Sequence, residues 1–222
     1  MATAARVSVS RGNSFTAKHV LWVVFGLMTL FVLATRERTL LDSTSFLHQR
    51  YAPISWLMFL HGIPGALALF LGVFQFSSRL RQRYLNVHRV MGRIYVGSAV
   101  ISAPVAIAVA FALPLPTLFM ASVIQATGWV VTTGTALYCA RTGRIQQHRE
   151  WMIRGYPFAA IFVVARVLVA IPAIARMGAL GIATVVWSLV AIAGLLPSFI
   201  IAWQALATSK RAVKVRIAAA AD

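Results

Sequence analysis

Long stretches of apolar residues, separated by short polar and basic segments, organise the whole chain. Each stretch has roughly the 20 residues that a helix needs to cross the hydrocarbon core of a bilayer. A helix is also the state in which a lone segment satisfies its own backbone hydrogen bonds in lipid. The six stretches cover residues 19–35, 54–76, 94–113, 117–140, 155–174 and 181–206. The pattern therefore predicts an all-α integral membrane protein with six transmembrane helices, of which the second to the fifth form the bundle.

The same pattern predicts three parts: a basic N-terminal tail (1–18), a six-helix transmembrane domain (19–206) and a basic C-terminal tail (207–222). The first apolar stretch has a second interpretation. A basic lead, a short apolar core and small residues near Ala34 are also typical of a secretory signal. We favour a retained helix, because the basic leader is long and the apolar run is nearly of spanning length.

The basic residues are distributed very unevenly between the two sides of the predicted bundle. Of the 21 Lys and Arg residues, sixteen fall on the side that carries both termini, four fall on the other side, and Arg166 lies within the fifth stretch. Loops rich in Lys and Arg stay in the cytoplasm. The bias therefore predicts cytoplasmic N- and C-termini and a multi-pass protein of the bacterial inner membrane.

Composition excludes two functional classes. Only 11% of the residues are charged, whereas a soluble domain has about 25%. The net charge of +17 comes from short blocks between apolar runs, so it does not form the basic face of a nucleic-acid-binding protein. Such blocks attract anionic lipid head groups, by about 1 kcal/mol per residue near the surface. We therefore predict the bilayer and its anionic lipids as partners, and no nucleic acid.

Two segments before apolar stretches resemble one another. Both 88–95 and 148–156 read His-Arg, a short gap, Arg, one residue and Tyr, and the gaps differ by one residue. Duplication of a helical hairpin would produce this repeat. Chance is the alternative, since only four positions agree.

The two histidines of this repeat, His88 and His148, are the candidate cofactor ligands. Two imidazoles that face each other at one depth can ligate a b-type haem iron from both sides. Neighbouring arginines would bind the haem propionates through paired hydrogen bonds; they are Arg89, Arg93, Arg149 and Arg154. The alternative is that these His-Arg pairs anchor helices at the lipid head groups.

A second group of polar residues is predicted inside the membrane. His61, Gln125 and Arg166 lie on three different stretches at a similar depth, about 10–13 Å from the outer face at 1.5 Å per residue. None of the four acidic residues lies in an apolar stretch to balance Arg166. An ionisable residue in a span is a functional-site hypothesis by default. The alternative is that Arg166 stabilises the bundle by donating hydrogen bonds to carbonyl groups.

The second stretch presents one face of small and polar residues, which are His61, Gly65, Ala68, Gly72 and Gln75. They fall within an arc of roughly 80° on a helix. Small residues let another helix, or a flat cofactor, approach closely. Helix packing is the commoner explanation of such a face.

Several of these motifs occur together and in order. The first group of motifs consists of His61 and Gly65, Gly72-Val73-Phe74-Gln75-Phe76, Leu80-Arg81, His88-Arg89 and Gly92-Arg93-Ile94-Tyr95. The second group consists of His148-Arg149-Glu150-Trp151-Met152-Ile153-Arg154 and Arg166. Over residues 55–170 the chain resembles a bacterial family of predicted multi-pass membrane proteins catalogued as a domain of unknown function. The resemblance implies signature positions at His61, Gln75, His88, Arg93, His148, Arg154 and Arg166. It implies no activity, and the first and sixth stretches lie outside it.

Three functions remain open from the sequence. The first is a cofactor protein that binds a b-type haem or a quinone for membrane electron transfer. The second is a structural or assembly subunit that contacts another membrane protein, and the third is a small-molecule carrier. The chain has no phosphate-binding glycine loop, zinc-ligand spacing or paired intramembrane carboxylates, so no catalytic signature assigns it to an enzyme class.

Overall fold

The computed structural model describes residues 14–38, 42–113 and 116–219. Every long element in this part of the chain is a helix. The helices before the bundle are α1 (Ser14–Val32), which continues into a π-helical turn (Leu33–Glu37), and the short α3 (Phe46–Tyr51). The bundle helices are α4 (Ser55–Gln75), α6 (Leu85–Ala112), α7 (Pro116–Arg141) and α8 (Ile145–Val169). Short α5 (Ser78–Arg83) and α9 (Pro172–Ala175) lie in the connections, and α10 (Gly178–Ala219) ends the chain.

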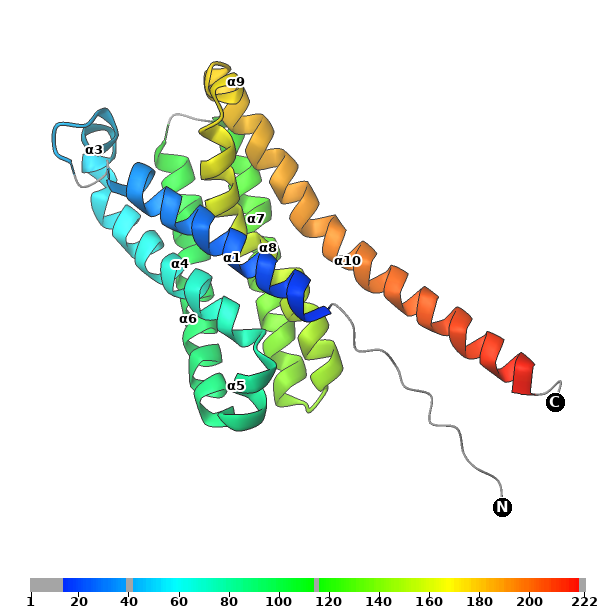
Figure 1. The fold of residues 1–222 in the computed structure, drawn as a ribbon. Helices are drawn as coiled ribbons and strands as arrows, with labels where there is room; N and C mark the ends of the chain where they lie inside the picture. Colours follow the sequence, from blue (N-terminus) through cyan, green and yellow to red (C-terminus); the bar gives the residue numbers. More distant parts are fainter. Residues whose placement is uncertain (1–13, 39–41, 114–115, 220–222) are drawn as a thin grey trace.

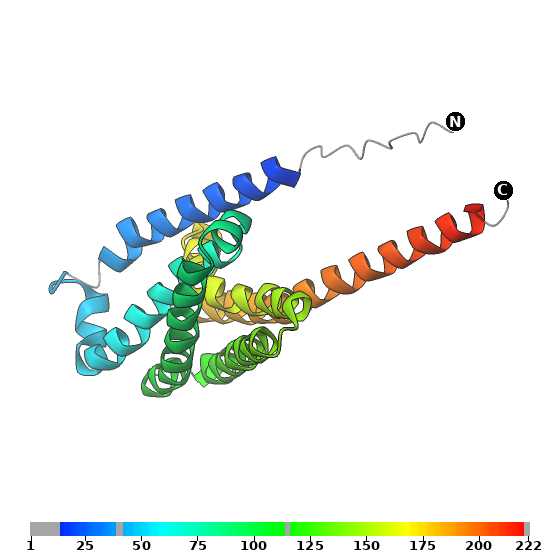
Figure 2. The same ribbon diagram turned by 90° about the horizontal axis from the view of Figure 1, so that it is seen from below.

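The four bundle helices pack in a ring. The most extensive contacts are between α4 and α6, then between α7 and α8 and between α6 and α7, and α4 closes the ring against α8. Helices α6 and α8 therefore stand diagonally across the bundle. Helix α1 crosses the outside against α8, and α10 packs against α8 and α7 before it runs away from the bundle (Figures 1 and 2).

Four helices in the described part of the chain are long and apolar enough to cross a membrane: His48–Gln75, Leu85–Ala112, Ile145–Val169 and Gly178–Thr208. The apolar part of the first helix, Val20–Thr35, is shorter. Helix α7 has 26 residues, which is long enough, but polar residues such as Gln125, Thr132 and Thr133 interrupt it. These findings confirm the predicted class of all-α membrane protein.

The small-residue face of α4 packs against protein. Ala68 and Gly72 are buried. A Cβ atom added at Gly65 would lie 3.1 Å from Ser102 Oγ of α6, and one added at Gly72 would collide with the ring of Tyr156 of α8. Close approach at small residues is how membrane helices associate. The helix-packing interpretation of this face therefore describes the fold.

Two bundle helices begin earlier than the apolar pattern indicates. Helix α6 begins at Leu85 and α8 at Ile145, about three turns before the predicted stretches. Apolar periodicity marks only the part of a helix in lipid, and a helix continues through its polar end. His88 and His148 thus lie in the first turns of helices, within the bundle.

Helix α10 also exceeds its predicted bounds. It has 42 residues, about 63 Å at 1.5 Å per residue, and its backbone is helical through 207–219 of the predicted tail. Ala, Lys and Arg are good helix formers, and cations are favourable near a helix C-terminus. These properties let the helix continue beyond the apolar segment.

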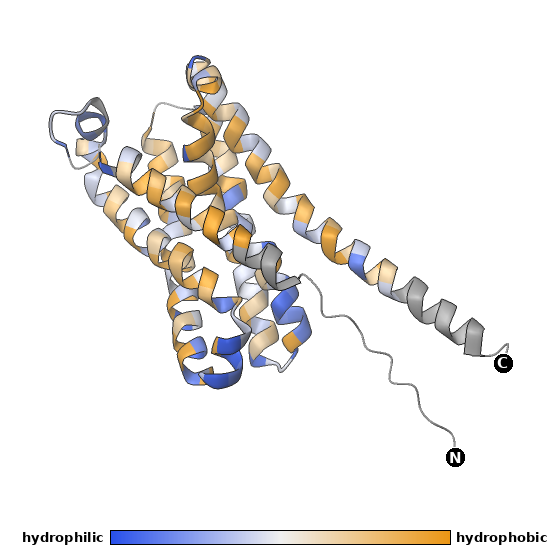
Figure 3. Ribbon diagram, viewed as in Figure 1, coloured by the Kyte–Doolittle hydropathy of each residue, from blue (hydrophilic) through white to orange (hydrophobic). Residues whose placement is uncertain are grey.

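Most of the basic residues of the bundle gather at one end. This basic end consists of α5, the first turns of α6, and the turn that joins α7 to α8, and it is the most hydrophilic part of the bundle in Figure 3. Gly143 has a φ of 74° in the α7–α8 turn, a conformation that glycine adopts without steric cost. The tight turn places the start of α8 beside the end of α7.

Candidate functional site

The basic end brings His88 and His148 together across the bundle. They stand on diagonal helices, in the first turns of α6 and α8. His88 is close enough to His148, Arg81 and Arg89 for their charges to act on its ring. The fold thus places the two equivalent histidines of the sequence repeat within electrostatic range of each other.

The two imidazoles have different hydrogen-bonding environments. His148 Nδ1 lies 2.9 Å from the backbone carbonyl oxygen of Ala136 in α7. A carbonyl only accepts, so Nδ1 donates, and in the neutral ring Nε2 carries the lone pair that can bind a ligand. His88 Nδ1 is buried without a hydrogen-bond partner. His148 is oriented by protein, whereas His88 has an unused polar atom.

Gln75 supplies a second unused atom at this end. Its side chain is only 7% exposed, and its Nε2 donor is buried without a partner. Its Oε1 lies against Gly92 of α6, where an added Cβ would be 3.3 Å away. Gly92 is small enough to let this amide enter the bundle next to the first turns of α6.

The tyrosines of the repeat also meet inside the bundle. Trp129 Nε1 donates to the Tyr95 hydroxyl over 3.1 Å, and the Tyr156 hydroxyl donates to the Leu69 carbonyl over 3.0 Å. Both rings border the position of Gly72. The equivalent tyrosines of both halves of the repeat therefore lie on either side of one small residue of α4.

The structure separates Arg93 and Arg154 from the histidine pair. Arg93 is exposed and lies about 140° round α6 from His88, and Arg154 lies about 120° round α8 from His148. Arg154 instead forms an ion pair with Glu150 at 3.7 Å and lies 4.9 Å over the ring of Trp151.

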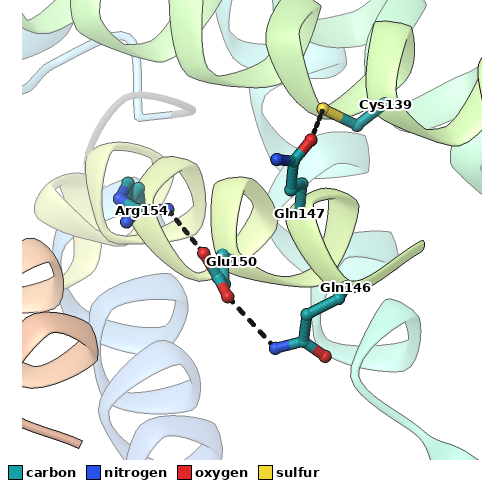
Figure 4. A network of polar contacts seen from close by, with 5 residues as sticks. All are labelled: Cys139, Gln146, Gln147, Glu150 and Arg154. Atoms are coloured by element: carbon teal, nitrogen blue, oxygen red, sulfur yellow. Dashed lines mark hydrogen bonds and ion pairs between the residues drawn. The ribbon is translucent and has the colours of Figure 1, made fainter. Parts of the chain in front are cut away.

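Figure 4 shows where this ion pair lies. Gln146, Glu150 and Arg154 follow one stripe of α8, and Gln146 Nε2 donates to Glu150 over 3.1 Å. Gln147 extends in another direction, to the thiol of Cys139 in α7 at 3.9 Å. Arg154 thus interacts with residues of its own helix, and it does not face His148.

A different arginine, Arg81, is close enough to His88 for its charge to act on the ring. Its guanidinium donates to the backbone carbonyl oxygen of Gln75 over 3.3 Å and to Ser78 Oγ over 3.5 Å. Partial burial and the charge of Arg149 lower the pKa of Arg81. The sequence marked Arg81 as part of the Leu80-Arg81 motif. Its spacing along the chain did not connect it with His88, which lies beyond the break between α5 and α6.

The intramembrane residues have separate partners. His61 Nδ1 lies 3.0 Å from both the carbonyl oxygen and Oγ of Ser102, and Ser102 Oγ donates to the His61 carbonyl over 2.9 Å. Gln125 Nε2 donates to the carbonyl oxygen of Phe158 over 3.0 Å. These bonds join α4 to α6 and α7 to α8. Ser102, a polar residue in an apolar run, was overlooked in the sequence.

Arg166 lies in the last turn of α8, because this helix ends at Val169. Its guanidinium is 4.9 Å from the ring centroid of Phe162, and its charge acts on His61. A cation is favourable at a helix C-terminus, and α8 ends five residues earlier than the predicted stretch 155–174. The surroundings therefore favour the structural interpretation of Arg166.

Comparison with known proteins identifies a family and no closer relative. No curated protein and no solved structure matches the chain. The model of a family described as "Predicted membrane protein (DUF2306)" matches residues 58–206, so the similarity extends beyond residue 170 into α10. The chain therefore belongs to this family of predicted membrane proteins.

Proposed function

We propose that this protein crosses the bacterial inner membrane six times, with both termini in the cytoplasm. The six spans are α1, α4, α6, α7, α8 and α10. The excess of Lys and Arg on one side supports an orientation with the basic end in the cytoplasm.

Single cysteines in a Cys139→Ser background test this topology. Arg83→Cys at the basic end is expected to react with a membrane-impermeant maleimide only after the cells are opened. Arg176→Cys, at the opposite end, is expected to react in intact cells with a permeable outer membrane. The reverse labelling pattern would contradict the orientation.

We propose further that His88 and His148 bind a b-type haem at the basic end, and that the protein takes part in membrane electron transfer. The observation that carries this proposal is the hydrogen bond from His148 Nδ1 to the Ala136 carbonyl. Histidines that ligate metals usually donate their other ring nitrogen to such an acceptor, which fixes the ring and leaves a lone pair for the metal. A bound haem would supply one-electron transfer.

The surroundings of the pair suit the charge of haem. The charge of Arg81 acts on His88, the charge of Arg149 acts on Arg81, and guanidinium groups bind carboxylates through two parallel hydrogen bonds. We therefore assign the propionates to these two arginines, in place of Arg93 and Arg154. A quinone is the alternative cofactor, because its carbonyl oxygens would accept hydrogen bonds from the Gln75 amide and from His88.

The absorption spectrum of the detergent-purified protein tests this proposal. We expect a Soret band that His88→Ala and His148→Ala each remove, whereas His48→Ala, in α3 outside the bundle, retains it. Organic extraction followed by chromatography tests for a quinone. A purified, folded protein with neither pigment nor quinone would contradict cofactor binding, as would a Soret band unchanged in both variants.

One observation favours an assembly subunit as the second candidate. The outer surface of α10 carries large apolar side chains at Leu195, Phe199, Trp203 and Leu206, and Leu195 is 72% exposed. Such a helix could pack against another membrane protein. Stable co-purification with a larger complex, lost in Leu195→Ser/Phe199→Ser, would support this function. A pigmented protein that runs as a lone monomer would contradict it.

A further inference from the structure

The basic end concentrates positive charge without a matching carboxylate. Arg81 of α5 and Arg149 of α8 are close enough to interact, and Arg81 and His88 also interact. Among the side chains that the structure describes, the carboxylates are Asp42, which binds Thr44, and Glu150, which pairs with Arg154. Like charges held together are unfavourable unless an anion lies between them.

The polar atoms that remain unused at this end are suited to an anion. Gln75 Nε2 is a hydrogen-bond donor, and His88 Nδ1 donates when it carries a proton. Both atoms are buried without a partner, and a buried donor left unsatisfied costs about 1–3 kcal/mol. A bound anion would satisfy both atoms and the guanidinium groups at once.

The residues of this site come from different helices, and hydrogen bonding and close packing position Gln75 and Arg81. Gln75 ends α4, and the Arg81 guanidinium donates to the Gln75 backbone carbonyl. Gly92 of α6 gives the Gln75 amide its place in the bundle. The donors therefore come from the α4–α5 connection and from the first turns of α6 and α8, at the basic end of the bundle.

We infer that Gln75, Arg81, His88 and Arg149 form a binding site for a phosphate group at the basic end of the bundle. Guanidinium groups bind phosphate through charge-assisted, paired hydrogen bonds. The phosphate can belong to the head group of an anionic lipid or to a free phosphate ion. The site shares Arg81, His88 and Arg149 with the proposed haem site, so a phosphate group and haem would compete for these residues, whereas Gln75 has no role in the proposed haem binding.

Binding to the purified full-length protein tests the site with two probes. Inorganic phosphate is titrated by calorimetry in detergent, and phosphatidylglycerol is compared with phosphatidylcholine in nanodiscs by native mass spectrometry. Phosphate binding in detergent supports a free-ion site, whereas retention of phosphatidylglycerol alone supports a lipid head-group site. Binding of neither probe would overturn the inference.

Matched variants distinguish this site from general electrostatic attraction. Arg81→Gln/Arg149→Gln is expected to weaken binding of the responsive probe at least tenfold, because each charge-assisted bond contributes about 1.5–3 kcal/mol. The control Arg79→Gln/Arg93→Gln removes the same charge from exposed positions at this end, and a change below about twofold is expected at moderate salt. Equal losses in both double variants would overturn the inference.

Gln75→Leu tests the buried amide without a change of charge. We expect about a tenfold or greater loss of binding, the effect of one hydrogen bond to a charged group. Unchanged binding in a folded Gln75→Leu protein would remove this residue from the site and overturn the inference as stated. The Soret absorption of Gln75→Leu, measured in parallel, separates failure of the phosphate site from failure of the haem proposal, because Gln75 is not assigned to haem.

Discussion

The basic end and the membrane-embedded half of the bundle use polar residues in opposite ways. Within the membrane, His61 and Ser102 bond to each other, and Gln125 bonds to a backbone carbonyl of the neighbouring helix. At the basic end, Gln75 Nε2 and His88 Nδ1 are buried without partners. The first arrangement fastens helices together, whereas the second leaves bonding capacity for a ligand. Depth in the membrane alone is therefore a poor guide to a binding site.

The largest expected change in stability is at Gly72 of α4, which packs closely against Tyr156 of α8 and Tyr95 of α6. Gly72→Ala places a methyl group against the rings of Tyr156 and Tyr95. Overpacking of this kind typically costs about 1–3 kcal/mol, so we expect a clear fall in Tm in detergent. Gly62→Ala is the control on the same helix, since no atom lies within 4 Å of the added Cβ. Equal melting temperatures for the two variants would contradict the packing described for α4.

The next prediction contrasts one polar residue from each region. Ser102→Ala removes the hydroxyl that donates to the His61 carbonyl, and we expect a loss of about 1 kcal/mol. Gln75→Leu removes an amide whose nitrogen has no partner, so stability is expected to stay within about 0.5 kcal/mol or to rise. Unfolding in mixed micelles followed by circular dichroism measures both. A larger loss for Gln75→Leu than for Ser102→Ala would reverse the comparison.

The smallest effect is expected at Gln125. Gln125→Leu removes its hydrogen bond to the Phe158 carbonyl. Side-chain hydrogen bonds between membrane helices average about 0.6 kcal/mol, so the fall in stability should be close to the limit of detection. Phosphate binding and any Soret absorption should be unchanged, because Gln125 joins α7 to α8 and does not belong to the proposed binding site at the basic end. A loss of ligand with retained stability would instead make Gln125 a binding residue.

The histidine pair shows what could be recognised from sequence. The repeated His-Arg motif identified His88 and His148 as equivalent positions, and the structure places them opposite each other on α6 and α8. Neighbouring arginines were predicted as their partners from proximity in sequence, and these included Arg93 and Arg154. Those residues face other directions on their helices, since a few residues of separation rotate a side chain far from the starting face. Arg81, beyond a helix break, comes closer to His88 because α5 folds back against α6.

The intramembrane residues show a different limit of sequence analysis. Equal depth predicts that His61, Gln125 and Arg166 share one site. The charge of Arg166 acts on His61, whereas Gln125 bonds to the Phe158 carbonyl, because depth does not specify direction round a helix. Ser102 satisfies His61 from a helix whose register with α4 depends on contacts at Gly65 and Ala68. Helix boundaries also mattered, because the end of α8 at Val169 places Arg166 in a last turn.

The amino-acid sequence alone determined the membrane class, the approximate helices and the family. Burying a charge or an unpaired backbone group in lipid is costly, so each spanning segment must be apolar and helical, and both properties can be read from its own residues. The sequence repeat likewise marked the two histidines. The tertiary structure decided which polar atoms are paired and which remain available, since pairing depends on rotation and register between helices far apart in the chain. Those relations arise from side-chain packing, and they separate the polar contacts that hold the bundle from the proposed binding site at its basic end.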